Sequence, residues 1–337
     1  MSLSGWKQLE CFAYWHNRVI SAPYGELLWE LGSVGETKLM NVAPLYVLDG
    51  EPLDWYAEVP LRGKRQVDLS AQYVGSTFYK GNLLSGRSVE KEGDFFHFYT
   101  QTLGKEKESL LSICSLYLEA DVRENQTPKI SSFINLAGDM VTKLLPSLLK
   151  WRGREQETSP VLTWLEKMRP WCEPWHMGFM ESRKDHPLRL VLLLKQGLSD
   201  IPKILEKCGG QPLGKDHLLF LQKLGNDTAF TYMLDLDIFP DGTLGDIVGV
   251  EFIPKDAIWP KDQKQWIETP AYQDFIASLQ EEGYADERVK ALPSAIFTQD
   301  LPDDITLHSR ISHFKLRWKS GTPMAAKVYV QMRALRE

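Results

Sequence analysis

Cysteine is scarce in this chain, which has four in 337 residues. They are far apart, and no two form a Cys-x-x-Cys motif: Cys11, Cys114, Cys172 and Cys208. This spacing argues against a structural zinc site and favours reduced, mostly buried thiols in a cytoplasm.

Long apolar runs are also missing. No stretch approaches the roughly 18 apolar residues that a membrane-spanning helix needs. The N-terminus, MSLSGWKQLE, lacks the basic and then apolar pattern of a signal peptide. We therefore expect a soluble, cytoplasmic protein without a membrane partner.

Positive charge is not in excess either. Lys and Arg number 39 against 45 Asp and Glu, which gives a net charge of -6. A nucleic-acid binder needs a surplus of cations across its surface, so we expect no nucleic-acid partner and only a local anion site. The motifs G-x-G-x-x-G, G-x-x-x-x-G-K-[ST] and G-x-S-x-G do not occur, which argues against dinucleotide, P-loop and α/β-hydrolase enzymes.

Two runs near the C-terminus show the clearest pattern in the chain. Residues 310–318 and 325–332 alternate between apolar and polar side chains, and a Ser-Gly turn lies between them. A period of two residues with such a turn predicts an antiparallel hairpin. One side of each run is apolar, and the other carries His313, Lys315, Arg317, Lys327 and Tyr329. These polar side chains face either bulk water or a cavity.

The same unit recurs along the chain. Further strand pairs are predicted at 53–61 with 67–73, 94–102 with 109–120, 174–183 with 188–195, and 228–238 with 246–253. A helix is the alternative for 109–120. Helices are predicted at 5–32, 131–150, 160–168, 199–208, 215–224, 266–282 and 286–292, and a loop at 75–93. We expect a single domain over residues 1–337. Its first part, 1–130, holds the helical opening and first hairpin, and residues 131–337 hold clear strand-strand-helix-helix repeats.

Strand pairs with one apolar and one polar side, alternating with helices, predict an α+β fold. Specifically, we expect an antiparallel ten-stranded β-barrel with a polar lumen and helices outside it. In element order the chain resembles the ABBA-type prenyltransferases. Short strand signatures similar to that family are Lys327-Val328-Tyr329, Phe314-Lys315-Leu316-Arg317, Leu188-Arg189-Leu190 and Ala57-Glu58-Val59-Pro60.

The resemblance implies an enzyme that moves a prenyl group from an allylic diphosphate to an electron-rich acceptor. The acceptor is an aromatic small molecule or a peptide side chain in natural-product biosynthesis. Two alternatives stay open: a non-catalytic barrel that binds a peptide or an anion, and another peptide-modifying enzyme on the same barrel.

Cations on polar strand sides are the candidates for diphosphate binding, because Arg offers bidentate donors and Lys compact charge. They are Arg189, Lys195, His313, Lys315, Arg317 and Lys327, with the hydroxyl of Tyr329. In the resembling family tyrosine rings also shield the allylic cation, which makes Tyr232 and Tyr329 candidates for that role. The alternative for each residue is an outward-facing polar side or, for the tyrosines, core packing.

A buried carboxylate could accept the proton that the acceptor loses. Glu58 is the first candidate, because it lies on an early strand, where the family has its base, and Glu251 is the second. Either could instead pair with a cation in the lumen. Asp235-x-Asp237 invites a metal-binding interpretation, but a structural or surface role is favoured. We therefore predict no protein-bound metal and no required cofactor, with Mg²⁺ on the diphosphate left open.

Overall fold

The structure is a computed structural model of the chain. It describes residues 11, 15, 54–63, 68–74, 115–120, 130–135, 139–180, 183, 185–225, 229–255, 257, 259–319 and 322–336. The predicted helix at 5–32, apart from helical Cys11 and Trp15, lies outside the described residues, as do the loop at 75–93 and the strand at 94–102.

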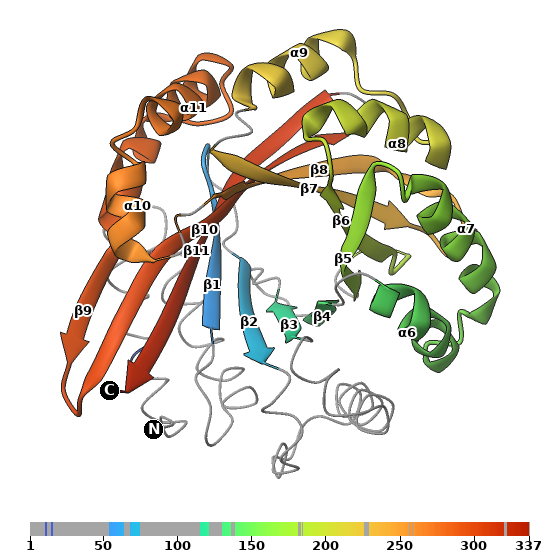
Figure 1. The fold of residues 1–337 in the computed structure, drawn as a ribbon, viewed down its shortest axis with the longest axis horizontal. Coiled ribbons are helices and arrows are strands. Elements are labelled where there is room, and N and C mark those ends of the chain that lie inside the picture. Colours follow the sequence, from blue (N-terminus) through green and yellow to red (C-terminus); the bar gives the residue numbers. More distant parts are fainter. Residues whose placement is uncertain are drawn as a thin grey trace.

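The strands form one curled antiparallel sheet (Figure 1). They are β1 (Asp54–Pro60), β2 (Asp68–Val74), β3 (Ser115–Ala120), β4 (Ile130–Asn135), β5 (Cys172–Phe179), β6 (Leu188–Leu194), β7 (Phe230–Ile238), β8 (Leu244–Pro254), β9 (Phe297–Leu301), β10 (Ile305–Lys319) and β11 (Thr322–Arg336). Their order is β11-β1-β2-β3-β4-β5-β6-β7-β8-β10-β9, and β10 also pairs with β11. The predicted C-terminal hairpin is therefore the longest strand pair and joins β1 to β8.

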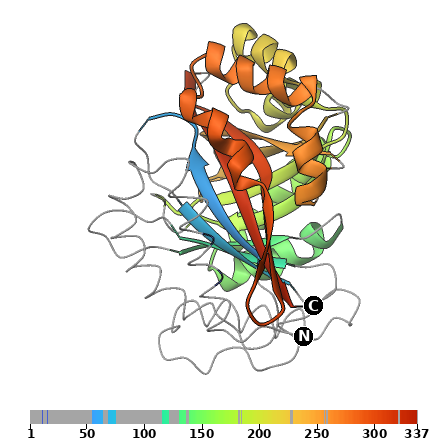
Figure 2. The same ribbon diagram turned by 90° about the vertical axis from the view of Figure 1, so that its left-hand side faces the viewer.

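Helices cover the outer face of this sheet (Figures 1 and 2). They are α6 (Asp139–Trp151), α7 (Thr158–Met168), α8 (Ile201–Cys208), α9 (Lys215–Leu224), α10 (Pro260–Trp266) and α11 (Pro270–Glu281), with 3₁₀ turns η2 (Glu155–Glu157), η3 (Leu198–Asp200) and η4 (Glu287–Ala295). A pair of α-helices follows each of β4, β6 and β8, as the repeat predicts. Within the described ranges, no helix combines the length and apolar character needed to span a bilayer.

Three local predictions were wrong. Residues 131–135 belong to β4 and not to a helix, because β3 needs a second partner and the sequence ISSFIN alternates. The predicted helix at 266–282 begins too early, since α11 starts at Pro270 after the Thr269 cap, and the preceding helix α10 was not predicted. The predicted helix at 286–292 is the 3₁₀ segment η4, which contains Pro293. The short strand β9 was not predicted.

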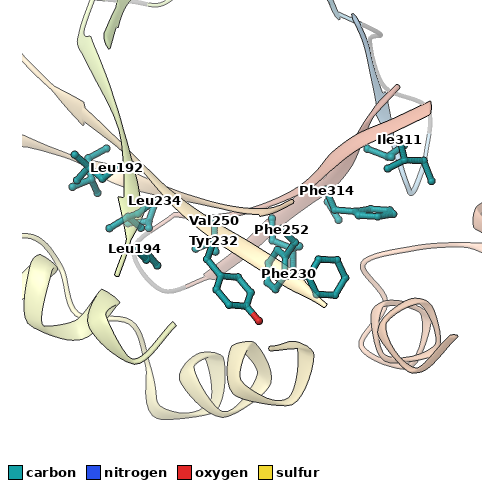
Figure 3. Close-up of a cluster of buried hydrophobic side chains, with 14 of the residues drawn as sticks. Leu192, Leu194, Phe230, Tyr232, Leu234, Val250, Phe252, Ile311 and Phe314 are labelled. Atoms are coloured by element: carbon teal, nitrogen blue, oxygen red, sulfur yellow. The ribbon is translucent and has the colours of Figure 1, made fainter. Parts of the chain in front are cut away.

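The hydrophobic core lies between the outer face of the sheet and the helices. Phe230, Phe252 and Phe314 are buried on neighbouring strands, as Figure 3 shows. Phe275 of α11 packs among them, with ring centroids 4.9 Å from Phe230 and 5.0 Å from Phe314. Burial of each such ring stabilises the fold by about 1.5–3 kcal/mol. Because side chains alternate along a strand, the residues between these positions face the concave side of the sheet.

A buried glutamine fixes an irregularity in β10 that matters for the concave side. The pairing of β10 with β11 shifts between Ile311 and His313, which is a β-bulge at Ser312. Gln263 accepts a hydrogen bond from the Ile311 amide (2.7 Å) and donates to the Ile311 carbonyl and to the Ala257 carbonyl (3.0 Å). The bulge leaves Ile311 in the core while Arg310, Ser312 and His313 all reach the concave side.

Candidate functional site

The concave side of the sheet encloses a cavity of about 450 Å³. Its walls come from β1, β3 to β8, β10 and β11, so residues far apart in the sequence meet there. Aromatic rings and charged groups alternate around it. The lining residues are Asp54, Tyr56, Glu119, Phe133, Asn135, Trp175, His176, Arg189, Val191, Met233, Glu251, Ile253, Arg310, Ser312, His313, Lys315, Tyr329, Gln331 and Arg333.

Three arginines surround one aspartate beside this cavity. Arg189 of β6 lies opposite Asp237 of β7 and donates to both carboxylate oxygens, at 2.8 and 2.9 Å. Arg183, in the turn before β6, donates to the same carboxylate at 2.7 Å. Burial raises the pKa of Asp237, but Arg189, Arg183 and more distantly Arg317 outweigh it and lower the pKa. The cluster therefore has more positive than negative charge.

Arg317 differs from the other two arginines of this cluster, because it does not contact Asp237 directly. It is half-buried on β10, opposite Gly249 of β8. Within the described ranges its side chain makes no hydrogen bond or ion pair. A guanidinium in that position can donate to an anionic ligand, because Arg317 interacts with Asp237 only from a distance.

Lys315 is held by two carboxylates. Its ammonium group contacts Asp235 of β7 and lies 3.1 Å from Glu251 of β8. Gly249 makes this possible, since a Cβ there would lie 3.1 Å from both Asp235 Oδ2 and Lys315 Cε. Burial raises the pKa of Asp235 despite the attraction of Lys315.

Glu58 and Lys327 form a second buried ion pair, across β1 and β11. Burial alone raises the pKa of Glu58, but the charges of Lys327 and Lys315 and hydrogen bonds from Lys327 and Tyr329 lower it to about 2. The Tyr329 phenol has a pKa well above its ordinary value because of burial and the nearby Glu58. At neutral pH Glu58 is therefore an ionised carboxylate, and the phenol of Tyr329 beside it keeps its proton.

His313 stacks on the ring of Tyr329, with centroids 4.0 Å apart and planes inclined by 19°. Its Nε2 lies 3.8 Å from Glu251. Burial first, and then the charge of Lys315, lower the pKa of His313 to about 3. Burial likewise lowers the pKa of His176, on the opposite wall, to about 3. Both imidazoles are neutral at pH 7, so His313 acts as a flat neutral ring and not as a cation.

This state of the histidines predicts how stability depends on pH. Between pH 6.5 and about 3 the unfolded chain binds a proton at His313 that the folded protein does not bind. The free energy of unfolding should therefore fall as the pH drops below 6.5, by roughly 1 kcal/mol per pH unit from each such histidine. Urea unfolding at pH 7, 6 and 5 measures the slope, and His313→Gln should flatten it. An imidazole NMR signal of His313 that titrates near pH 6.5 would contradict the prediction.

Most predicted site residues come together here. Arg189, Glu251, His313, Lys315 and Tyr329 line the cavity. The others on the concave side are next to it: Glu58 pairs with Lys327 and accepts a hydrogen bond from Tyr329, and Arg317 acts on Asp237. Their roles toward a ligand stay predictions.

Two predicted site residues lie elsewhere. Tyr232 is in phase with Phe230 and Leu234, so it faces the helices and packs edge-on against Phe252 in the core (Figure 3). Lys195 follows the end of β6, where its ammonium donates to the Arg169 carbonyl (2.9 Å) and pairs with Glu173 (3.3 Å). Both line a separate cavity of about 460 Å³. Tyr232 therefore lies on the core face of β7, and Lys195 lies just past the end of β6. Neither lines the cavity on the concave side.

Sequence reasoning did not identify which cations the acidic residues meet, and it missed several further cations. Of the structural and surface roles predicted for Asp235 and Asp237, the structure shows the structural one, because both are buried counter-ions. Arg183, and the ion pair of Arg333 with Asp54, also went unnoticed. The available signal was the even spacing of Asp235 and Asp237 from cavity-facing Met233, but only the pairing of strands shows which cation each one meets. In the part of the chain described, no three His, Cys, Asp or Glu side chains are arranged to hold a metal ion.

Comparisons with known proteins were made with both sequence and fold. No family model and no curated protein matches the sequence. The fold is similar to a 5-dimethylallyl tryptophan synthase from Streptomyces coelicolor solved with DMASPP and Trp, at a TM-score of 0.53 and 10% identity over 98% of this chain and 95% of that one. A 6-dimethylallyltryptophan synthase from Micromonospora olivasterospora, also solved with DMASPP and Trp, gives 0.53 and 12% over 97% of each chain.

A third similar structure is the prenyltransferase PriB in a ternary complex with L-tryptophan and dimethylallyl thiolodiphosphate. Its TM-score is 0.51 at 14% identity, over 90% of this chain and 95% of that one. At these identities the likeness concerns the fold. These three structures, which share the curled antiparallel sheet and outer helices of this chain, are ABBA-type aromatic prenyltransferases.

Proposed function

We propose that this chain is a transferase that moves a prenyl group from an allylic diphosphate to an electron-rich acceptor. We further infer that β1 to β8, β10 and β11 close into a ten-stranded barrel around the cavity, because β10 pairs with β8 and β11, and β11 pairs with β1. A closed barrel keeps bulk water away from a reactive carbocation.

The observation that carries this proposal is the arginine cluster beside an aromatic-lined cavity. Arg183, Arg189 and Arg317 all act on Asp237, and with Glu119 counted as a second carboxylate near them a positive charge is still left for a ligand. An arginine guanidinium can donate two parallel hydrogen bonds to two oxygens of a diphosphate. Lys315, Lys327, His313 and Tyr329 complete the set of donor-binding candidates predicted from the sequence.

The chemistry asks little else of the protein. Cleavage of the C–O bond leaves its electron pair on the diphosphate, whose charge the cluster stabilises, and gives an allylic cation. The rings of Tyr329, Tyr56, Phe133 and Trp175 surround that cation in the cavity. The acceptor's π electrons then form the new bond, and the resulting cationic adduct loses a proton.

Glu58 is the proposed base for that last step. Its pKa of about 2 keeps it ionised at neutral pH. A weak base suffices, because a protonated aromatic ring is a strong acid. Glu251, which lines the same cavity, is the alternative base.

The acceptor is proposed to be aromatic, since the similar structures hold Trp beside a dimethylallyl donor. An acceptor within a peptide natural product belongs to the same proposal. No cofactor is required in this mechanism. Mg²⁺ bound to the donor is a separate possibility that an assay with and without EDTA decides.

The direct test offers the protein dimethylallyl and geranyl diphosphate with L-tryptophan or a tryptophan-containing peptide. We expect pyrophosphate release that depends on the acceptor, together with a product heavier by one prenyl group in mass spectrometry. Free release without a prenylated product would indicate hydrolysis. No release from any allylic donor would contradict the proposal and favour a non-catalytic barrel that binds a peptide or an anion.

A further inference from the structure

The two buried aspartates of β7 have different surroundings. Asp237 accepts three hydrogen bonds from two arginines, so there are more cations than carboxylates at this contact. Asp235 lies two residues away, where Lys315 contacts it directly and Arg189 acts on it from further off. Among the described residues, the Lys315 ammonium is the only donor that reaches its carboxylate.

Lys315 in turn has more negative than positive charge around it. Asp235 and Glu251 contact it from neighbouring strands, so the three groups together carry a net charge of one minus. A dianionic or trianionic ligand that approaches Lys315 therefore meets two carboxylates at the same place. The repulsion is strong because the three groups are buried and poorly screened by water.

Gly249 leaves the space in which Lys315 and Asp235 approach each other. It is the cross-strand partner of both Asp235 and Arg317. Because it has no side chain, Lys315 and Asp235 meet in the space where a Cβ would stand, 3.1 Å from each. The absence of a side chain at this position of β8 thus lets the lysine reach Asp235.

From this geometry we propose that Asp235 is a positioning residue that withholds Lys315 from the donor diphosphate and so limits donor affinity. The inference rests on the proposed function, because it assumes a diphosphate ligand. Arg183, Arg189 and Arg317 then hold the donor, and Lys315 joins them only when Asp235 is neutral.

The charged and titratable groups around Asp235 allow a pH test. They are Arg189 of β6, Asp237 of β7, Glu251 of β8, Lys315 and His313 of β10, and His176 of β5. Asp235 has a raised pKa, whereas those of Asp237, His176 and His313 are lowered. As the pH falls, Asp235 therefore takes up a proton before these neighbours do.

The experiment is a calorimetric titration of the full chain with inorganic pyrophosphate. Asp235→Asn keeps the shape of the side chain and removes its charge, so pyrophosphate should bind about tenfold more tightly than to the wild type, which corresponds to about 1.4 kcal/mol. Asp246→Asn is the matched control, because Asp246 is an exposed residue of β8 that pairs with Lys319 at 3.6 Å. It makes the same change in net charge, and its affinity should stay within twofold of the wild type.

A double-mutant cycle separates this role from a general effect of charge. In a Lys315→Gln background, Asp235→Asn should no longer tighten pyrophosphate binding, because the cation that it releases is gone. The ratio of wild-type to Asp235→Asn affinity should also move towards one as the pH is lowered, because the pKa of Asp235 is raised. Protonation of pyrophosphate itself cancels in that ratio.

The outcomes are decisive in each case. An Asp235→Asn gain no larger than that of Asp246→Asn, or one that persists without Lys315, overturns the inference. If Asp235→Asn does not fold, the wild type is compared with Lys315→Gln over the same pH range, and only the wild type should gain relative affinity as the pH falls. Wild-type protein that binds pyrophosphate but transfers no prenyl group contradicts the proposed function and leaves this inference standing.

Discussion

Replacement of Glu58 by Gln is expected to reduce prenyl transfer by about 10² to 10⁴-fold while donor binding persists. Gln keeps the shape of the side chain but cannot accept the proton that is lost as the acceptor regains aromaticity. The donor carries its charge already in the ground state, so its affinity depends on the cations and not on this base. Lys327 even loses its counter-ion in the variant, which favours the diphosphate.

Two measurements check this expectation: the affinity for a dimethylallyl thiolodiphosphate analogue and kcat for prenyl transfer. Glu251→Gln is the parallel variant, because Glu251 lines the same cavity and is the alternative base. If Glu58→Gln keeps full turnover and Glu251→Gln loses it, Glu251 is the base. Full turnover in both variants would mean that the reaction needs no carboxylate base.

Asp237→Asn is expected to lower the free energy of unfolding by about 3–5 kcal/mol, the cost of removing one member of a buried ion pair. Asp237 is 4% exposed and neutralises Arg189, which is 5% exposed. Without that carboxylate, Arg189 and Arg183 lose the partner that both contact, while the repulsion between them remains. Urea unfolding of wild type and variant measures the difference.

The same variant should respond more strongly to pyrophosphate. A ligand that binds only the folded state raises stability by its own binding free energy, and the uncompensated arginines bind the anion more tightly. We therefore expect pyrophosphate to restore part of the loss. Glu173→Gln is the control, because this exposed pair with Lys195 contributes at most about 1 kcal/mol and lies outside the cluster. A loss in Asp237→Asn no larger than in this control would mean that the arginines are solvated, and the diphosphate site would lose its basis.

Local patterns in the sequence were sufficient for much of the sheet. Alternation identified the hairpin of β10 and β11 and placed Lys315 and Lys327 on its polar side, because a two-residue period in a strand needs no knowledge of the partner. The helix at Lys215–Leu224 was predicted at its observed bounds. Tyr232 shows the limit of this reasoning: every second residue shares a face, but which of the two faces is the core depends on what packs there.

The sequence by itself determined the type of fold and the presence of a polar strand face rich in cations. Only the tertiary structure determined which carboxylate each of those cations pairs with. Arg189 and Asp237 are 48 residues apart in the chain, and Lys327 and Glu58 are 269 apart, yet the two members of each pair are hydrogen-bonded to each other. Strand order and register bring them together, and neither is encoded in the local spacing of residues. Since a buried charge is tolerated only beside an opposite one, the pairing of strands determined which cations are neutralised and which are not.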